Sequence, residues 1–162
     1  MKKLLVALAL LICVSSFADD LNLWKNSTLN KIVQSGTLRV GMEPGYMPFE
    51  MTNKKGEIIG FDVDMAKQMA KAMGVKLTFV PTAWDGIIAA LLTDKFDILM
   101  SGMTVTQERN LKINFATPYI SVGQTILANK KHEGKTWKDL DTPEHTIVTK
   151  LGVTGEIATR KM

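Results

Sequence analysis

A turn rich in small, hydroxylated and basic residues follows one short segment of the chain. Residues 96–100 are apolar enough for a buried strand, and Ser101, Gly102, Thr104 and Arg109 come directly after it. A free carboxylate is best held by a guanidinium in a bidentate pair, and N–H groups at a helix start add donors. Serine and threonine hydroxyls can bond an ammonium or a carboxylate. This pattern indicates an anion-binding turn, although spacing alone favours a capped surface helix that carries a solvated arginine.

Two aromatic residues and one acid occupy other loops that follow expected strands. Tyr46 and Trp84 could clamp an aliphatic or cationic side chain between their rings. Glu43 could supply a carboxylate for a polar or cationic ligand tail. Taken singly, each aromatic is more typical of a core or loop anchor, and an acid in a loop is more often solvated. Together, two rings and an acid favour a basic or amide-bearing ligand.

Strands and helices alternate along the chain, which predicts an α/β fold with a mostly parallel sheet. The expected strands are 37–42, 75–79, 96–100 and 146–149, and a small hairpin is expected over 49–59. Helices are expected over 61–73, 87–92 and 106–110, with another beginning at 155. In such sheets, ligands bind beyond the carboxyl ends of the strands. That rule selects four loops, at residues 43–49, 81–86, 101–109 and 150–155.

The helix over 61–73 has the clearest sequence pattern. Asp62 is the expected N-cap, and Gly74 is the expected stop. Met65, Met69 and Met73 recur every four residues, a stripe more typical of a core face than of a cofactor site. Capping and the helix dipole explain the acids of its first turn better than a metal pair does. The sequence therefore predicts no metal site and no cofactor.

The first residues are typical of a secretory signal. Two lysines precede an apolar run over 4–14, and small residues end at Ala18. The run is too short to span a bilayer, which needs about 20 residues. Cys13 is the only cysteine and follows Ile12, so no lipid anchor is expected. We expect cleavage after Ala18 and export to the periplasm.

Charge excludes one class of partner. Cleavage after Ala18 would remove two of the 20 basic residues, which leaves 18 against 16 acidic ones and a net charge of +2. That excess is too small to predict nucleic-acid binding.

Five sequence blocks resemble, in order, the polar amino-acid-binding proteins of ABC importers. They are EPGYMPFE at 43–50, GFDVD at 60–64, PTAWDG at 81–86, SGMTVTQER at 101–109 and FATPY at 115–119. The resemblance runs from about residue 37 to the end of the chain. It implies a type II periplasmic-binding-protein-like fold with two α/β lobes that close over one amino acid.

The resemblance also implies a role for each candidate residue. Tyr46 and Trp84 would sandwich the ligand side chain near Glu43. The α-amino and α-carboxylate groups would be bound by Ser101, Gly102, Thr104 and Arg109, with Arg109 on the carboxylate. From across the cleft, Lys150 and Thr154 would contact the ligand. Val153 stands where the family commonly has threonine.

The resemblance divides the chain into a signal peptide at 1–18, a first lobe at 19–128, and a hinge exit with the start of a second lobe at 129–162. With the second lobe only partly present, we expect weak ligand binding by a monomer and a mobile segment after about residue 130. The acidic partner that the family gives to the ligand's ammonium cannot be assigned.

The expected function is to bind a polar L-amino acid and deliver it to the membrane permease of an ABC importer. One alternative is an amino-acid-sensing receptor domain. Another is an enzyme on the same fold, such as a dehydratase. His132 and His145 lie in a polar stretch away from the strand-end loops, and no catalytic residue is expected.

Overall fold

The computed structural model describes residues 24–161 of the 162-residue chain. The predicted signal peptide and its cleavage site therefore lie outside the described residues. Within these residues, no helix combines the length and the apolar character needed to cross a membrane.

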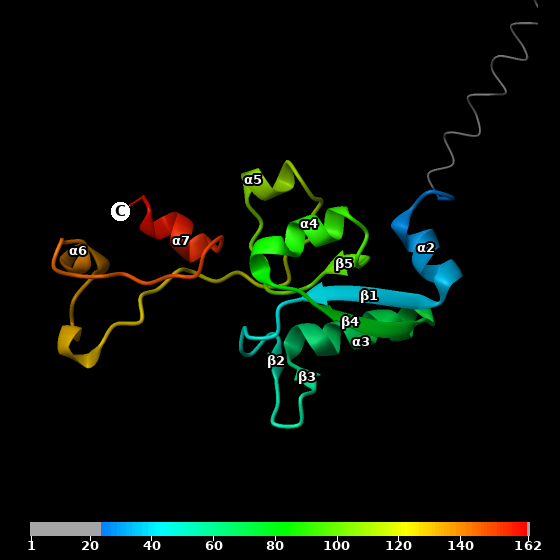
Figure 1. Ribbon diagram of the computed structural model, residues 1–162, viewed down its shortest axis with the longest axis horizontal. Helices are drawn as coiled ribbons and strands as arrows, with labels where there is room; N and C mark the ends of the chain where they lie inside the picture. Colours follow the sequence, from blue (N-terminus) through cyan, green and yellow to red (C-terminus); the bar gives the residue numbers. More distant parts are fainter. Residues whose placement is uncertain (1–23, 162) are drawn as a thin grey trace, which may run out of the picture.

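An α/β unit at residues 28–111 forms the larger part of the structure (Figure 1). Its strands are β1 (Thr37–Met42), β2 (Met51–Thr52), β3 (Ile58–Ile59), β4 (Lys76–Pro81) and β5 (Ile98–Leu99). Its helices are α2 (Thr28–Ser35), α3 (Phe61–Met73), α4 (Ile87–Leu92) and α5 (Gln107–Asn110), with a 3₁₀ turn η1 (Trp84–Gly86).

The main sheet has the order β4-β1-β5, and both pairings are parallel. β2 and β3 form a separate antiparallel hairpin that turns at residues 53–56. These observations confirm the predicted α/β class, the parallel sheet and the hairpin.

Helices cover both faces of β1, as parallel strands require. On one face Val40 packs with Val63 and Ala66 of α3, and all three side chains have no exposed surface. On the other face, Ile87 of α4 packs with Phe96. The two clusters fix the carboxyl ends of the strands at one edge of the sheet.

Helix α3 differs in two respects from the sequence prediction. Its N-cap position is Gly60, whose φ of 138° suits glycine, and Asp62 is not the cap. Asp62 falls in the first turn with its side chain fully buried. The methionine stripe is only partly in the core, because Met69 is 39 % exposed while the alanines beside it are buried.

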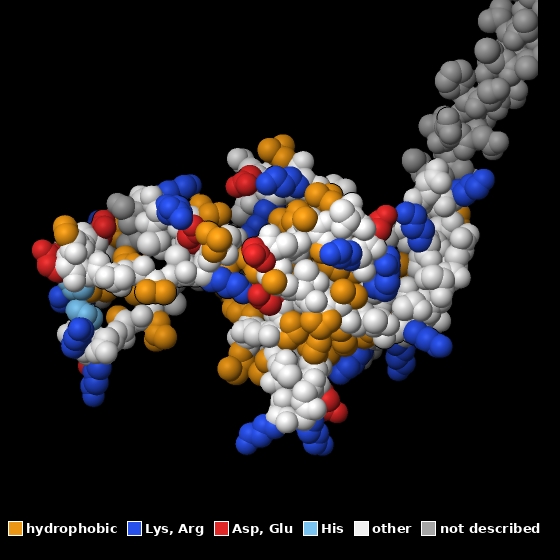
Figure 2. Space-filling view, in the orientation of Figure 1, with side chains coloured by type: hydrophobic (Ala, Val, Ile, Leu, Met, Phe, Trp, Pro, Cys, Tyr) orange, Lys and Arg blue, Asp and Glu red, His pale blue; other side chains and the backbone are white. Residues whose placement is uncertain are grey.

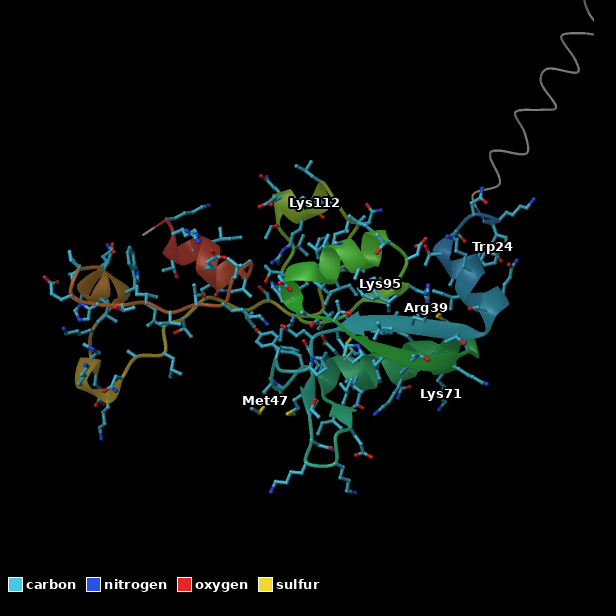
Figure 3. The ribbon with its side chains drawn as sticks, viewed as in Figure 1. Trp24, Arg39, Met47, Lys71, Lys95 and Lys112 are labelled. Carbon is cyan, nitrogen blue, oxygen red and sulfur yellow. The ribbon has the colours of Figure 1, made fainter. Side chains whose placement is uncertain are left out.

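One ion pair stabilises the sheet at a distance from the edge where the predicted ligand-binding loops lie. Arg39 of β1 donates to Asp97 through Nη2 at 2.6 Å and through its backbone N–H at 2.8 Å. Its Nη1 also donates to the carbonyl oxygen of Lys95, near which it lies in Figure 3. Met47 marks the loop beyond the other end of β1 (Figure 3).

A C-terminal segment, residues 129–161, extends from the α/β unit (Figure 1). It contains η2 (Lys130–His132), α6 (Trp137–Leu140) and α7 (Thr154–Thr159), so the helix expected near residue 155 is confirmed. The strand expected over 146–149 is wrong, because those residues pair with no strand within residues 24–161. Val148 is 88 % exposed, in keeping with a segment that packs on no sheet.

Candidate ligand-binding site

The parallel sheet brings three of the predicted loops to one edge. β1 ends just before Glu43, β4 just before the loop that carries Trp84, and β5 just before the turn at Ser101. The Trp84 N–H donates to Glu43 Oε1 at 3.1 Å, and the Glu43 N–H donates to Ser101 Oγ at 3.0 Å. Direct hydrogen bonds therefore join three strand-end loops that are far apart in the sequence.

A large open cavity lies between this edge and the C-terminal segment. Its volume is about 1640 Å³, and its walls include Glu43, Tyr46, Trp84 and Arg109 on the α/β unit. In Figure 2 the surface is hollowed between the α/β unit and the C-terminal segment. The other five predicted site residues, Ser101, Gly102, Thr104, Lys150 and Thr154, also line it, so all nine do.

Two of the nine, Ser101 and Arg109, are buried. Ser101 is only 3 % exposed, so it lies at the base of the wall rather than at its surface. The structure therefore brings the whole predicted set together around one cavity. Whether each of these residues touches a ligand stays a prediction.

Glu43, Trp84 and Lys150 form one corner of the cavity. The Lys150 ammonium pairs with Glu43 Oε2 and lies 5.9 Å from the centre of the Trp84 ring. The two residues of the α/β unit therefore already hold one primary ammonium, which reaches them from the C-terminal segment.

Arg109 is the most deeply placed cation of the site, with 8 % of its surface exposed. Nη1 donates to the carbonyl oxygen of Thr104 at 2.8 Å, and Nη2 donates to that of Gly152 at 2.9 Å. Its guanidinium carbon lies 5.4 Å from the centre of the Trp84 ring. Burial lowers the pKa of Arg109 from its ordinary value. Within residues 24–161, no salt bridge joins this guanidinium to a carboxylate.

Local sequence explains why Arg109 is held there. Thr106 caps α5, because its side chain accepts the Arg109 N–H at 3.2 Å. The cap fixes the first turn of α5 and points the arginine back toward the cavity. The alternative of a solvated surface arginine is wrong, since the side chain is buried against two loops.

Hydroxyl and amide groups form the rim between the two sides of the cavity. Thr104 Oγ1 and Thr154 Oγ1 lie 3.5 Å apart, and Gln124 Nε2 donates to Thr154 Oγ1 at 3.1 Å. Gln124 was absent from the sequence prediction, because a glutamine in an extended stretch carries no distinguishing pattern. The rim therefore contains groups that can both donate to and accept from a ligand.

Tyr46 and Gly102 are packed against each other. Gly102 has a φ of 54°, and a Cβ atom added to it would lie 2.6 Å from the Tyr46 ring. Glycine is therefore required at this position both by its backbone and by the ring. Tyr46 stays 47 % exposed at the cavity wall, in reach of a bound molecule.

Two buried acids that the site prediction omitted lie behind the Ser101–Gly102 turn. Glu50 and Asp62 have no exposed surface. Ser101 Oγ lies 2.6 Å from Glu50 Oε1, and the Gly102 N–H donates to Asp62 Oδ2 at 3.0 Å. The position of Glu50 between two apolar residues, Phe49 and Met51, was the available signal, because an acid in such a run must find a buried partner.

The far wall of the cavity includes His132 and His145, whose ring centres are 5.0 Å apart. The prediction placed these histidines away from the strand-end loops, and they do belong to the C-terminal segment. In the part of the chain that the structure describes, no group of three or more potential metal-ligating side chains is close enough to hold a metal ion.

Comparison with known proteins places the chain in a family. The sequence profile of the bacterial extracellular solute-binding proteins, family 3, matches residues 38–159. The L-cystine-binding protein of Escherichia coli strain K12 is 40 % identical over 137 residues, which cover 83 % of this chain and 49 % of that protein. A cyclohexadienyl dehydratase of Pseudomonas aeruginosa is 36 % identical over 154 residues, which cover 94 % of this chain and 55 % of the enzyme. The chain thus spans about half the length of these relatives.

Solved structures show the same fold. A binding component of an ABC transporter from Wolinella succinogenes, complexed with lysine, has a TM-score of 0.75 and 62 % identity, covering 78 % of this chain and 55 % of that one. The arginine-bound form of domain 1 from TmArgBP has a TM-score of 0.54 and 45 % identity, covering 55 % of this chain and 71 % of that one.

These structures confirm the predicted periplasmic-binding-protein-like fold. The matched profile spans most of the α/β unit, the cavity wall and most of the C-terminal segment. The chain therefore belongs to the bacterial extracellular solute-binding proteins, family 3.

Proposed function

We propose that this protein binds one cationic L-amino acid in the cavity, with the α-carboxylate on Arg109 and the side-chain cation between Glu43 and Trp84. The observation that carries the proposal is the state of Arg109. A guanidinium that is 8 % exposed and has no carboxylate partner among the described residues favours an anion from outside. Carboxylate geometry matches its planar set of N–H donors.

The corner formed by Glu43 and Trp84 supports a cationic tail. It already holds the Lys150 ammonium through a carboxylate and the face of an indole ring. A lysine or arginine side chain brings the same charge and could take the place of Lys150 there. An aliphatic or acidic tail has no cation that could replace the Lys150 ammonium at Glu43.

The relatives support the same ligand class. One structural relative is complexed with lysine, and domain 1 of another is arginine-bound. The second case supports binding by a protein part that corresponds to little more than the α/β unit of this chain. It argues against our expectation that one complete lobe binds only weakly.

The proposal extends to the setting in which the protein works. The first 18 residues would direct export and be removed after Ala18. Residues 19–128 would form the first lobe, and residues 129–162 the hinge exit and the start of the second. The monomer would present its bound amino acid to the membrane permease of an ABC importer.

Paired ligands that differ in one charge test the ligand class. Isothermal titration calorimetry would compare L-lysine with L-norleucine, which replaces the ammonium by a methyl group, and L-arginine with the uncharged L-citrulline. We expect one cationic amino acid to bind at a 1:1 ratio and to bind at least tenfold more tightly than its neutral partner. Equal binding within both pairs, or no binding of any of the four, would refute the proposal.

The dehydratase relative makes an enzyme the second candidate. We infer binding without chemistry, because the cavity groups described above account for both ends of an amino acid. Mass spectrometry of the amino acid recovered after prolonged incubation decides between the two. Unchanged ligand supports a binding protein, and a dehydrated or otherwise altered product supports an enzyme.

A further inference from the structure

The buried acids Glu50 and Asp62 have no part in the proposed ligand contacts, yet both hold the turn that faces the ligand. Asp62 accepts from the Gly102 N–H at 3.0 Å and from the Tyr119 hydroxyl at 2.7 Å. Two donors therefore point at this carboxylate, one on each oxygen, as a charged carboxylate needs.

Glu50 has a different environment. Its Oε1 lies 2.6 Å from Ser101 Oγ, and within residues 24–161 its buried Oε2 has no hydrogen-bond partner. Burial and the neighbouring Asp62 charge raise the pKa of Glu50 to about 8, against the opposing effect of the Ser101 hydroxyl. The charge of Glu43 also raises the pKa of Glu50. A carboxyl group so placed holds its proton at neutral pH.

That proton determines what Ser101 can offer to a ligand. Ser101 Oγ already accepts the Glu43 N–H, and a hydroxyl has one proton and two lone pairs. If Glu50 is protonated on Oε1, it donates to Ser101 Oγ. Both lone pairs of this oxygen are then used, and the serine proton can point toward the cavity. If Glu50 is ionised, Ser101 donates to it and keeps one lone pair free, so toward the cavity the serine acts only as an acceptor.

We propose that Glu50 is a positioning residue that acts through Ser101, and that binding of the ligand's α-ammonium at this turn releases the Glu50 proton. An ammonium has only donors to offer, so it requires Ser101 as an acceptor. Its positive charge also favours the ionised form of Glu50. Both effects favour the ionised form of Glu50. The Gly102 N–H donates to Asp62 and so does not oppose them.

This inference rests on the proposed function, and the wild-type protein tests it without any substitution. Titration with L-arginine at pH 7 in two buffers of different ionisation enthalpy measures the protons released on binding. We expect up to one proton per ligand. The affinity should rise by up to about tenfold per pH unit between pH 6 and pH 8, where Glu50 still binds its proton in the free protein.

Glu50→Gln is the matched variant, because the amide has the same shape and cannot ionise. It should bind L-arginine more weakly, release no proton and lose the pH dependence due to Glu50. His132 and His145 also line the cavity, but both proteins contain them. Subtracting the variant's pH profile therefore removes their effect, and also that of Lys150 and Tyr119, which both proteins retain.

A second comparison needs no ligand. Glu50 has an ordinary pKa near 4.5 when the chain is unfolded and about 8 in the folded protein, so the folded state holds the proton more tightly. Folding is therefore favoured at low pH, and this advantage is lost as pH rises from about 4.5 to 8. The unfolding equilibrium constant from urea titrations should rise up to about tenfold per pH unit for wild type relative to Glu50→Gln.

The outcomes separate this inference from the proposed function. L-Arginine binding with no proton release, at an affinity that is unchanged between pH 6 and pH 8, would overturn the role of Glu50 and leave the binding function standing. Identical stability profiles for wild type and Glu50→Gln would overturn it as well. If neither L-arginine nor L-lysine binds, the proposed function itself fails and the role of Glu50 fails with it.

Discussion

Removing the Arg109 side chain should abolish the preference of the protein for ligands that carry a carboxylate. Two of the five N–H donors of this guanidinium donate to the carbonyl oxygens of Thr104 and Gly152, and within residues 24–161 the other three have no hydrogen-bond partner. Truncation of one partner in a buried, charged hydrogen bond costs about 2–5 kcal/mol. Arg109→Ala should therefore weaken L-arginine binding by roughly 30-fold to several thousandfold.

Agmatine, which is arginine without its carboxylate, makes this test specific to one end of the ligand. Wild-type protein should bind L-arginine far more tightly than agmatine in calorimetric titrations, and Arg109→Ala should bind the two about equally. Arg109→Lys should recover only part of the difference, because one ammonium cannot reproduce a planar fork of donors. The thermal midpoint of each variant checks that it is folded.

The reasoning would be refuted by an Arg109→Ala variant that keeps the wild-type ratio of L-arginine to agmatine affinity. A variant that loses both ligands equally would also contradict it, because Arg109 would then support the cavity as a whole. Glu43→Ala should weaken L-arginine binding less than Arg109→Ala does, since it removes a contact to the side chain alone.

Three other substitutions test separate parts of the structure. Glu43→Gln should reduce the preference for L-lysine over L-norleucine at least tenfold, as measured by calorimetry, and an unchanged ratio would place the ligand tail elsewhere. Gly102→Ala should lower the free energy of unfolding by about 1–3 kcal/mol, since φ is 54° and the new Cβ atom would lie 2.6 Å from the Tyr46 ring; urea titration would measure it. Asp97→Ala should cost about 1–3 kcal/mol of stability, because it leaves the Arg39 N–H and guanidinium without their partner, and it should leave ligand affinity unchanged.

The elements of the α/β unit could be predicted because their patterns are local. Alternating apolar residues predict β1, whose Leu38, Val40 and Met42 are at most 1 % exposed. Helix α3 ends at Gly74, which adopts a φ of 67° as a C-terminal stop requires. Each signal lies within a few residues of the structure that it specifies.

The strand expected over 146–149 shows where such reasoning ends. Its residues Thr146, Ile147, Val148 and Thr149 are β-branched and favour extended backbone. A strand also needs a partner for its N–H and C=O groups, and among the residues that the structure describes no strand pairs with this segment. The β-branched residues favour extended backbone, but whether they form a strand depends on a partner strand from another part of the chain.

The candidate site was predictable where it follows the strand ends and was missed where it depends on long-range hydrogen bonds. The rule that ligands bind beyond parallel strands selected the loops of Glu43, Trp84 and Ser101, which the structure joins directly. Asp62 was interpreted as a helix cap, because nothing near it in the sequence indicates a partner 40 residues away at Gly102. The apolar neighbours of Glu50 indicate that it is buried, but its partner Ser101 lies 51 residues further along and is set by the fold.

A crystal structure of the protein grown with L-arginine tests the central claim most directly. The account predicts the α-carboxylate within hydrogen-bond distance of the Arg109 guanidinium, and the ligand's own guanidinium on Glu43 beside the Trp84 ring, with Lys150 displaced. A ligand whose carboxylate lies away from Arg109, or whose side chain leaves the Glu43–Lys150 pair intact, would contradict it.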